Sequence, residues 1–228
     1  MEFSKKEIEE FGAKLSALGG RLGFEKAPKD QYIDLEEFFL DSTRFVFAEE
    51  RLARCIENWI RTYGFLISPS KIKRLIVNEK YPYDQAVLGV FLKIIALNSK
   101  QLNLKSLQIF CKKKKTLTYR SPSKVKVSEK NFDPVWLIFN IATHHFVDET
   151  QKNLLNFEFT LKQSPELKFR IESDDVTSSD YKAYLLREGK GKSLNHISKK
   201  IHAHYSNLHK FFVRFEKFGV IERLNQLP

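Results

Sequence analysis

The stretch over 193–221 constrains the fold more than any other part of this 228-residue chain, because its apolar residues recur at helical intervals on both sides of a short polar corner. The recurring residues are Leu194, Ile197, Ile201, Leu208, Phe212 and Phe215, and Gly219 follows them. Residues three or four positions apart lie on one face of a helix. The spacing therefore predicts two short helices joined by a tight corner.

This segment resembles the winged helix-turn-helix of bacterial regulators. Its six apolar residues stand, in order, where that family places the apolar residues of the two helices, and Gly219, Val220 and Ile221 match the end of the recognition helix. Two positions depart from the pattern, since Ser198 stands where a small Ala is usual and His202 stands where the corner often has Gly. The resemblance implies a domain whose recognition helix enters the major groove of DNA.

A third helix is expected just before these two, as a winged-helix domain requires. Ser178 or Ser179 would cap a helix over 180–187, and its large side chains would pack beneath the other two helices. Those side chains are Tyr181, Tyr184 and Leu185. Only nine residues follow Gly219, so the usual two-stranded wing would be absent or completed by another segment. An ordinary helical hairpin packed inside a larger core would show the same spacing and stays open as an alternative.

The face of the second helix opposite its apolar residues is expected to reach DNA. The N-terminus of this helix favours a phosphate, and its basic side chains can contact phosphate or guanine. Lysines in and before the preceding helix would contact phosphates. The predicted DNA-binding residues are Lys192, Lys199, Lys200, His204, Tyr205, Ser206, Asn207, His209, Lys210 and Arg214.

The distribution of charge agrees with this expectation. The formal net charge of the chain is +11, and the excess of basic residues rises from +1 over 1–100 to +4 over 101–177 and +6 over 178–228. A basic surface attracts polyanions such as nucleic acids. Because the excess is greatest on the segment with the helix-turn-helix pattern, double-stranded DNA is the expected partner.

Several classes of protein and site are not indicated. Cys55 and Cys111 lie far apart without a CxxC spacing, so neither a disulfide framework nor a zinc ribbon is predicted. No stretch approaches the ~18 apolar residues of a membrane helix, and the charged start of the chain lacks a signal-peptide core. The chain also lacks a P-loop, Rossmann glycines, GxSxG, HExxH and a kinase signature. We expect a cytoplasmic protein that does not bind membranes, uses no cofactor and is not an enzyme.

Residues 1–112 are predicted to form a helical domain that binds a protein partner or forms a homodimer. Ser4 and Glu7 have the spacing of a capping box, and Asp34 begins the same spacing further along. Ser68, which precedes a proline, marks another helix start. The stretch over 82–98 is apolar on most sides, which is typical of a central buried helix.

Residues 113–177 are predicted to form a small mixed segment with two β-hairpins. Polar and apolar residues alternate over 116–128 and again over 155–171, on either side of SPS and QSPE respectively. A period of two predicts strands with one buried face. Between the hairpins, Asp133 and Pro134 introduce the apolar run VWLIFNIATHHF, which fits a capped helix or a strand, and we favour the helix.

Two clusters in this middle region carry side chains that could form a site. His144, His145, Asp148 and Glu149 carry metal-ligating groups, but their spacing is not HExxH and adjacent histidines diverge by about 100° around a helix. No metal site is predicted there. The run Lys112–Lys115 fits a solvated loop better than a nucleic-acid contact.

These observations define a fold class that is mainly α with a small β portion (α+β). The predicted domains are 1–112, 113–177 and, for the winged helix-turn-helix, 178–228. We expect a transcriptional regulator, or an antitoxin that represses its own operon, that reads double-stranded DNA with the helix over 205–218. The antitoxin hypothesis rests on analogy of architecture. The alternative is a non-enzymatic scaffold whose winged helix binds a protein partner.

Overall fold

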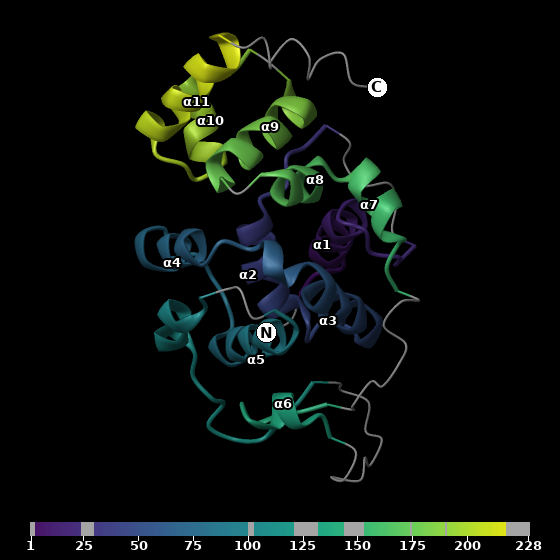
Figure 1. The fold of residues 1–228 in the computed structure, drawn as a ribbon. Helices are drawn as coiled ribbons and strands as arrows, with labels where there is room; N and C mark the ends of the chain where they lie inside the picture. Colours follow the sequence, from purple (N-terminus) through teal and green to yellow (C-terminus); the bar gives the residue numbers. More distant parts are fainter. Residues whose placement is uncertain are drawn as a thin grey trace.

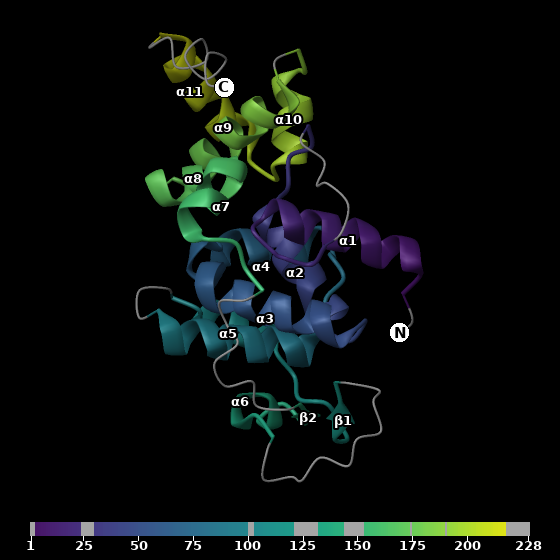
Figure 2. The same ribbon diagram turned by 90° about the vertical axis from the view of Figure 1, so that its right-hand side faces the viewer.

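The computed structural model describes residues 3–23, 30–99, 103–120, 132–143, 153–173, 175–189 and 191–217. These residues are mainly helical. Figures 1 and 2 show the last helices of the chain at one end, a body built from the first five α-helices in the middle, and two short strands at the other end. No helix within the described ranges has both the length and the apolar character that crossing a bilayer requires. The predicted wing, the second arm of the hairpin over 116–128 and the histidine cluster at 144–149 lie outside the described residues.

Five α-helices form the body, and local caps set where most of them begin. They are α1 (Lys5–Ala17), α2 (Leu35–Phe45), α3 (Glu50–Tyr63), α4 (Pro69–Asn78) and α5 (Gln85–Asn98), with 3-10 turns η1 (Gly64–Leu66) and η2 (Lys105–Phe110). Ser4 and Glu7 form a reciprocal capping box at α1. The side chains of Asp34, Ser68 and Asp84 accept backbone N–H groups at the starts of α2, α4 and α5. The helix starts predicted at Ser4, Asp34 and Ser68 are confirmed.

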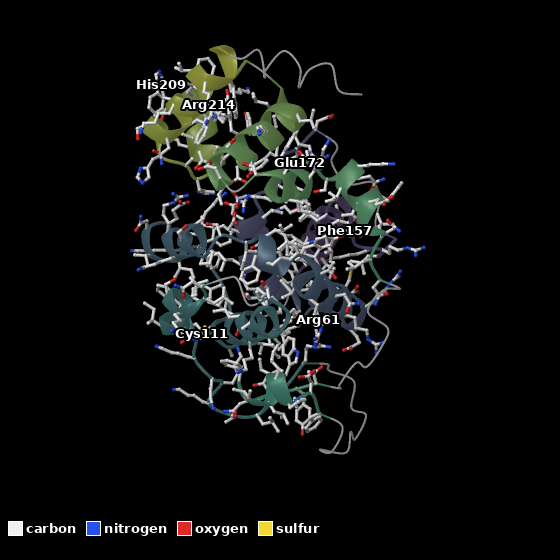
Figure 3. All side chains as sticks on the ribbon, in the orientation of Figure 1. Arg61, Cys111, Phe157, Glu172, His209 and Arg214 are labelled. Atoms are coloured by element: carbon white, nitrogen blue, oxygen red, sulfur yellow. The ribbon has the colours of Figure 1, made fainter. Side chains whose placement is uncertain are left out.

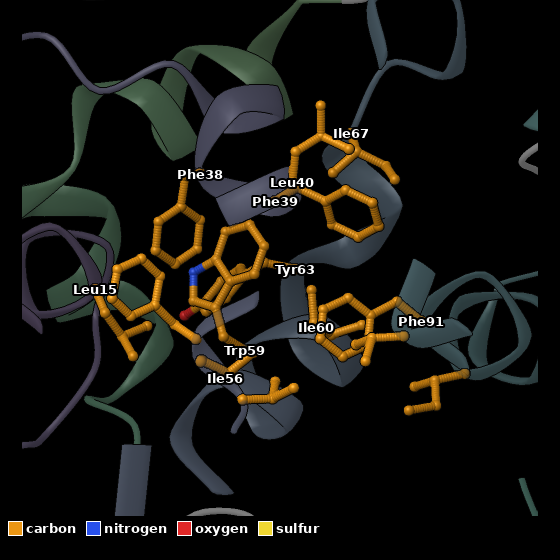
Figure 4. Close-up of a cluster of buried hydrophobic side chains, with 14 of the residues drawn as sticks. Leu15, Phe38, Phe39, Leu40, Ile56, Trp59, Ile60, Tyr63, Ile67 and Phe91 are labelled. Carbon is orange, nitrogen blue, oxygen red and sulfur yellow. The ribbon is translucent and has the colours of Figure 1, made fainter. Parts of the chain in front are cut away.

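The body encloses one large apolar core. Figure 4 shows Trp59 of α3 among Phe38 and the other buried side chains, with Phe91 of α5 to one side. The indole N–H of Trp59 donates to the carbonyl of Leu18 at 3.1 Å, so this buried ring leaves no polar group unpaired. Helix α5 is buried along most of its circumference against α2 and α3, as predicted for the central helix.

The strand end of the molecule differs from the prediction. Its elements are β1 (Thr118–Tyr119), α6 (Pro134–Leu137) and β2 (Ile141–Ala142). The first arm of the hairpin expected over 116–128 pairs in parallel with β2, which is a partner distant in sequence. The helix favoured after Asp133 ends at Leu137, because Asn140 has a φ of +59°, which a right-handed helix cannot contain. The Asn140 side chain holds this turn by donating to the Lys114 carbonyl at 2.6 Å.

The second predicted hairpin, over 155–171, is wrong. The region forms two helices, α7 (Phe157–Gln163) and α8 (Pro165–Glu172). Asn156 caps the first, and the Ser164 hydroxyl accepts the backbone N–H of Leu167 to cap the second.

The alternation in the second of these helices has a helical cause. Helix α8 is buried on two sides, since Leu167 belongs to the core of the body and Phe169 belongs to a second core. Residues two positions apart differ by about 200° around a helix axis. A short helix between two cores therefore has apolar residues at alternate positions without being a strand.

Three helices, which we call the head, form the last part of the described chain. They are α9 (Val176–Glu188), α10 (Leu194–Lys200) and α11 (Tyr205–Lys217). The second core comprises Tyr32, Phe169, Tyr181, Ala183, Tyr184, Leu185, Ile197, Ile201, Leu208 and Phe215. The expected packing of α9 beneath the other two helices is thus confirmed. The predicted cap is wrong, because α9 begins earlier and its N-cap is Asp175, which accepts the N–H of Ser178.

Candidate nucleic-acid interface

The corner between α10 and α11 sets the orientation of the predicted recognition helix relative to α10. Ser193 caps α10, and the carbonyl of His204 accepts the N–H groups of Asn207 and Leu208 at 3.0 and 3.1 Å at the start of α11. Between the helices, His202 has a φ of +50°, a left-handed conformation that Gly adopts most easily. The residue that departs from the family pattern therefore has the backbone conformation for which Gly is usual.

Helix α11 has an inward and an outward face, as its spacing predicted. Leu208 and Phe215 are 0% and 7% exposed, whereas Tyr205 on the opposite face is 50% exposed. The Tyr205 ring stacks on the ring of His209, with 6.0 Å between their centroids. Figure 3 labels His209 and Arg214 on α11, at the end of the molecule that lies away from the strands. All ten predicted DNA-binding residues are exposed to solvent.

The basic side chains of this surface have no ion-pair partner among the residues that the structure describes. They are Lys192, Lys199, Lys200, Lys210 and Arg214. Among the acidic side chains that the structure describes in and just before the head, Asp175 caps α9, Asp180 is buried and Glu188 accepts the backbone N–H of Tyr32. The positive charge of the head is therefore available to an external polyanion.

Three of the predicted residues lie toward the body and not along the free face of α11. Lys199 and His204 line a cleft together with Arg74 of α4. Lys200 lines a separate, smaller depression with Lys14 and residues at the start of α2. The ten residues thus divide between the outward face of the head and its junction with the body.

His202 fastens the corner to the body. Its Nε2 lies 2.8 Å from Oε1 of Glu37 on α2, and its Nδ1 lies 2.7 Å from Oε2 of Glu79 after α4. Burial lowers the pKa of His202, but the hydrogen bond to Glu37 and the negative charges of Asp34, Glu37 and Glu79 outweigh it, so the pKa is raised above 6.5. The charged imidazole can donate to both carboxylates at once.

A buried cluster of five charged residues lies beneath this contact and joins the head to the body. The Nζ of Lys71 lies 2.5 Å from Oδ2 of Asp34 and 2.5 Å from Oδ2 of Asp180. Arg170 donates through Nη1 and Nη2 to the two oxygens of Glu36 at 2.8 and 2.9 Å, and through Nε and Nη2 to Asp180 at 2.9 and 2.8 Å. Two residues of α2 or its cap, one of α4, one of α8 and one of α9 thus share one network.

The protonation of this cluster follows from its burial and its counter-ions. Burial outweighs the attraction of Lys71 and, with the charges of Glu36 and Asp180, raises the pKa of Asp34 to about 6. Burial also acts on Glu36, but the charges of Arg170 and Lys71 overcome it and lower its pKa to about 2. The cluster has three carboxylates and two cations, so its net charge becomes zero when one carboxylate takes up a proton. The raised pKa of Asp34 makes it the carboxylate that takes up this proton.

The same three carboxylates are close enough together to hold a metal ion. One oxygen from each of Asp34, Glu36 and Asp180 lies within 4.8 Å of the others. The Lys71 ammonium occupies the position between them, at 3.2 Å from Oε2 of Glu36 and closer to the other two. This cluster therefore serves as an internal salt bridge and does not leave a coordination site open.

Sequence reasoning missed the residues that attach the head to the body. Arg170 lies 134 positions after Glu36 and Asp180 lies 109 positions after Lys71, and no local pattern links them. Arg74 was missed because it belongs to an ordinary amphipathic helix of the predicted partner-binding domain. Only His202 carried a signal, since it replaced Gly in the corner.

Comparisons with protein-family models, with characterised proteins and with solved structures found no match to this chain.

Proposed function

We propose that the head binds double-stranded DNA and that α11 is its recognition helix. The observation that carries the proposal is the exposed face of α11, which presents aromatic and amide side chains together with Lys210 and Arg214. Lys192, Lys199 and Lys200 add to the charge of the head, and none of these five cations has a counter-ion in the described part of the chain. Helices joined by a tight corner in this way dock the second helix into the major groove.

Each group of residues has a role that follows from its chemistry. Lys210 and Arg214 can donate to phosphate or to the O6 and N7 of guanine. Ser206 and Asn207 lie in the first turn of α11, where the helix dipole attracts a phosphate and where the hydroxyl of Ser206 and the side-chain amide of Asn207 can donate to it. Lys192 precedes α10 and can contact the backbone beside the groove.

The biological role that we infer is transcriptional regulation, with repression of its own operon by an antitoxin as one form of it. In both cases the body supplies a protein-binding or dimerisation surface while the head binds DNA. The antitoxin form continues to rest on analogy of architecture.

Titration of a fluorescent duplex from the DNA upstream of its own gene tests DNA binding. Binding should be measured at about 50 and about 200 mM salt, because each phosphate contact makes affinity depend on salt. We expect binding at low salt that the combined Lys199→Glu, Lys200→Glu and Lys210→Glu substitutions abolish. A control with Lys5→Glu, Lys93→Glu and Lys162→Glu changes the net charge equally on exposed residues outside the head and should retain affinity. Absence of binding at low salt, or equal losses in the two variants, would contradict the proposal.

A protein-binding head is the second candidate, and the apolar content of its free face favours it. Tyr205 and Val213 are 50% and 49% exposed on α11. Exposed aromatic residues are enriched at protein interfaces. This function predicts a protein that co-purifies with the chain and is lost on Tyr205→Ala and Val213→Asp, together with no binding to the duplex at low salt.

A further inference from the structure

The cleft between the head and α4 contains positive charge from both parts of the molecule. Its lining residues are Arg74, Glu79, Ser198, Lys199, His202, Ala203 and His204. Arg74 comes from the body, whereas Lys199 and His204 flank the corner that leads into α11. A guanidinium, an ammonium and an imidazole thus face one opening at the junction.

The cations of the cleft are not neutralised by its one carboxylate. Glu79 Oε2 is held by Nδ1 of His202 at 2.7 Å, and the other ring nitrogen of His202 is engaged by Glu37. Neither Arg74 nor Lys199 has an ion-pair partner in the described ranges of the chain. An anion that enters the cleft would therefore find two cations with free donors.

The position of Arg74 relative to the recognition helix is fixed. His202 ties the corner to α2 and to the end of α4, and Lys71, only three residues before Arg74, is held by Asp180 of α9 in the buried cluster. His204 immediately precedes the first residue of α11. The backbone of Arg74 is thus held beside the start of the helix that would enter the groove, and its side chain lines the cleft there.

We propose that this cleft binds a backbone phosphate of the DNA that α11 reads, and that Arg74 is the residue of the body that contacts it. The DNA-binding surface then extends from the head onto α4. Arginine suits this role because its planar guanidinium can donate two parallel hydrogen bonds to one phosphate. The inference rests on the proposed function and adds to it a DNA contact outside the head.

The salt dependence of duplex binding tests the inference. Arg74→Ala should weaken binding several-fold and lower the slope of log affinity against log salt by about one, as expected for a lost phosphate contact. Arg74→Lys should recover most of the slope, because it restores a cation. Lys73→Ala removes an exposed charge from the adjacent position on α4 and, since Lys73 does not line the cleft, should leave the slope unchanged.

The outcomes separate the two proposals. If the unmodified protein does not bind the duplex, DNA binding itself is refuted and this inference falls with it. If the protein binds and the head lysine variant does not, but Arg74→Ala has the slope of the unmodified protein, only the extension onto α4 is refuted. If Arg74→Ala and Lys73→Ala change the salt slope equally, the change follows from net charge alone, and a phosphate contact by Arg74 is refuted. Thermal unfolding of Arg74→Ala, Arg74→Lys and Lys73→Ala checks that all three variants fold before their slopes are compared.

Discussion

Gly19 ends α1 in a conformation and a space that only glycine fits. Its φ is +97°, and a Cβ on it would lie 2.6 Å from Cγ2 of the buried Thr160. Gly23 also has a positive φ, of +70°, but its Cβ would meet nothing closer than 3.9 Å. A substitution at Gly23 therefore causes backbone strain alone, whereas one at Gly19 causes both backbone strain and steric overlap.

We expect Gly19→Ala to destabilise the protein more than Gly23→Ala. A Cβ in a left-handed conformation costs about 1–2 kcal/mol, and overpacking against Thr160 adds roughly 1–3 kcal/mol. Urea unfolding of both variants measures the difference in the free energy of unfolding. Equal losses would mean that Thr160 yields to the added methyl group.

Lys71 is the residue whose removal should damage the fold most. It is 4% exposed and lies among the three buried carboxylates, so Lys71→Met leaves them with Arg170 alone. Loss of one partner from a buried ionic network costs about 3–5 kcal/mol. Lys73→Met, two positions away on the exposed side of α4, should change stability by less than about 0.5 kcal/mol.

The pH dependence of the Lys71→Met defect provides a second check. Without the ammonium, the pKa values of the remaining carboxylates in the folded state rise, so the folded variant binds protons more tightly than the unfolded variant. Stability is then gained as pH falls, and the defect relative to the unmodified protein should be smaller near about pH 5 than near about pH 7. A defect that is independent of pH would show that lost packing, and not unpaired charge, is its cause.

Helices that begin with a local cap were predictable, whereas pairings between distant segments were not. Ser4, Asp34 and Ser68 mark helix starts through side chains that bond the backbone within three residues. Ser164 before Pro165 carries the same signal, but the alternation of apolar residues around it favoured a strand. The parallel pairing of β1 with β2 leaves no local trace, because its register depends on α6 and on the turn at Asn140.

The candidate site was predictable to a similar extent. The inward and outward faces of α11 follow from helical periodicity alone, and all ten proposed contacts are exposed as expected. The attachment of the head could not be derived, since it depends on Arg170 and Asp180 meeting residues of the body across more than a hundred positions. Arg74 joins the surface only as a result of that attachment.

The contact between His202 and Glu37 should stabilise the corner between α10 and α11 only within a limited range of pH. The raised pKa of His202 means that its contribution is complete below 6.5 and is lost as pH rises through the folded-state value. Burial alone would raise the pKa of Glu37. The hydrogen bond and the charge of His202 have the larger, opposite effect, so the pKa of Glu37 lies below 4.5. The contribution of Glu37 is complete above 4.5 and is lost as pH falls through its folded-state value. The contact is therefore strongest between these two limits.

His202→Asn tests this contact, because Asn tolerates the left-handed conformation but cannot carry the charge. The melting temperature of the variant should fall furthest below that of the unmodified protein near about pH 6, and the gap should narrow toward about pH 9. His204→Asn is the matched control, since His204 is exposed two positions further on. A gap that stays constant across this range would show that the imidazole acts through packing alone.

The described residues form two apolar cores, and both α8 and the buried charged cluster connect them. Leu167 of α8 belongs to one core and Phe169 belongs to the other, while the buried charged cluster connects α2 and α4 to α8 and α9. Apolar packing tolerates small displacements, but the hydrogen bonds of Arg170 to Glu36 and Asp180 require fixed directions. The cluster therefore sets the orientation of the head, and the head and body should unfold as one cooperative unit.

Calorimetry tests this coupling through Arg170→Met combined with Asp180→Asn, which removes one cation and one carboxylate and so preserves the net charge of the cluster. We expect a single transition for the unmodified protein and two for the variant, with the smaller core of the head melting first, because Lys71 then loses its charged partner on α9. Lys162→Met with Glu172→Gln makes a similar exchange at exposed positions and should keep one transition. If the cluster variant melts in one transition at a lower temperature, the cores are coupled by α8 packing and the ionic cluster adds stability without joining them.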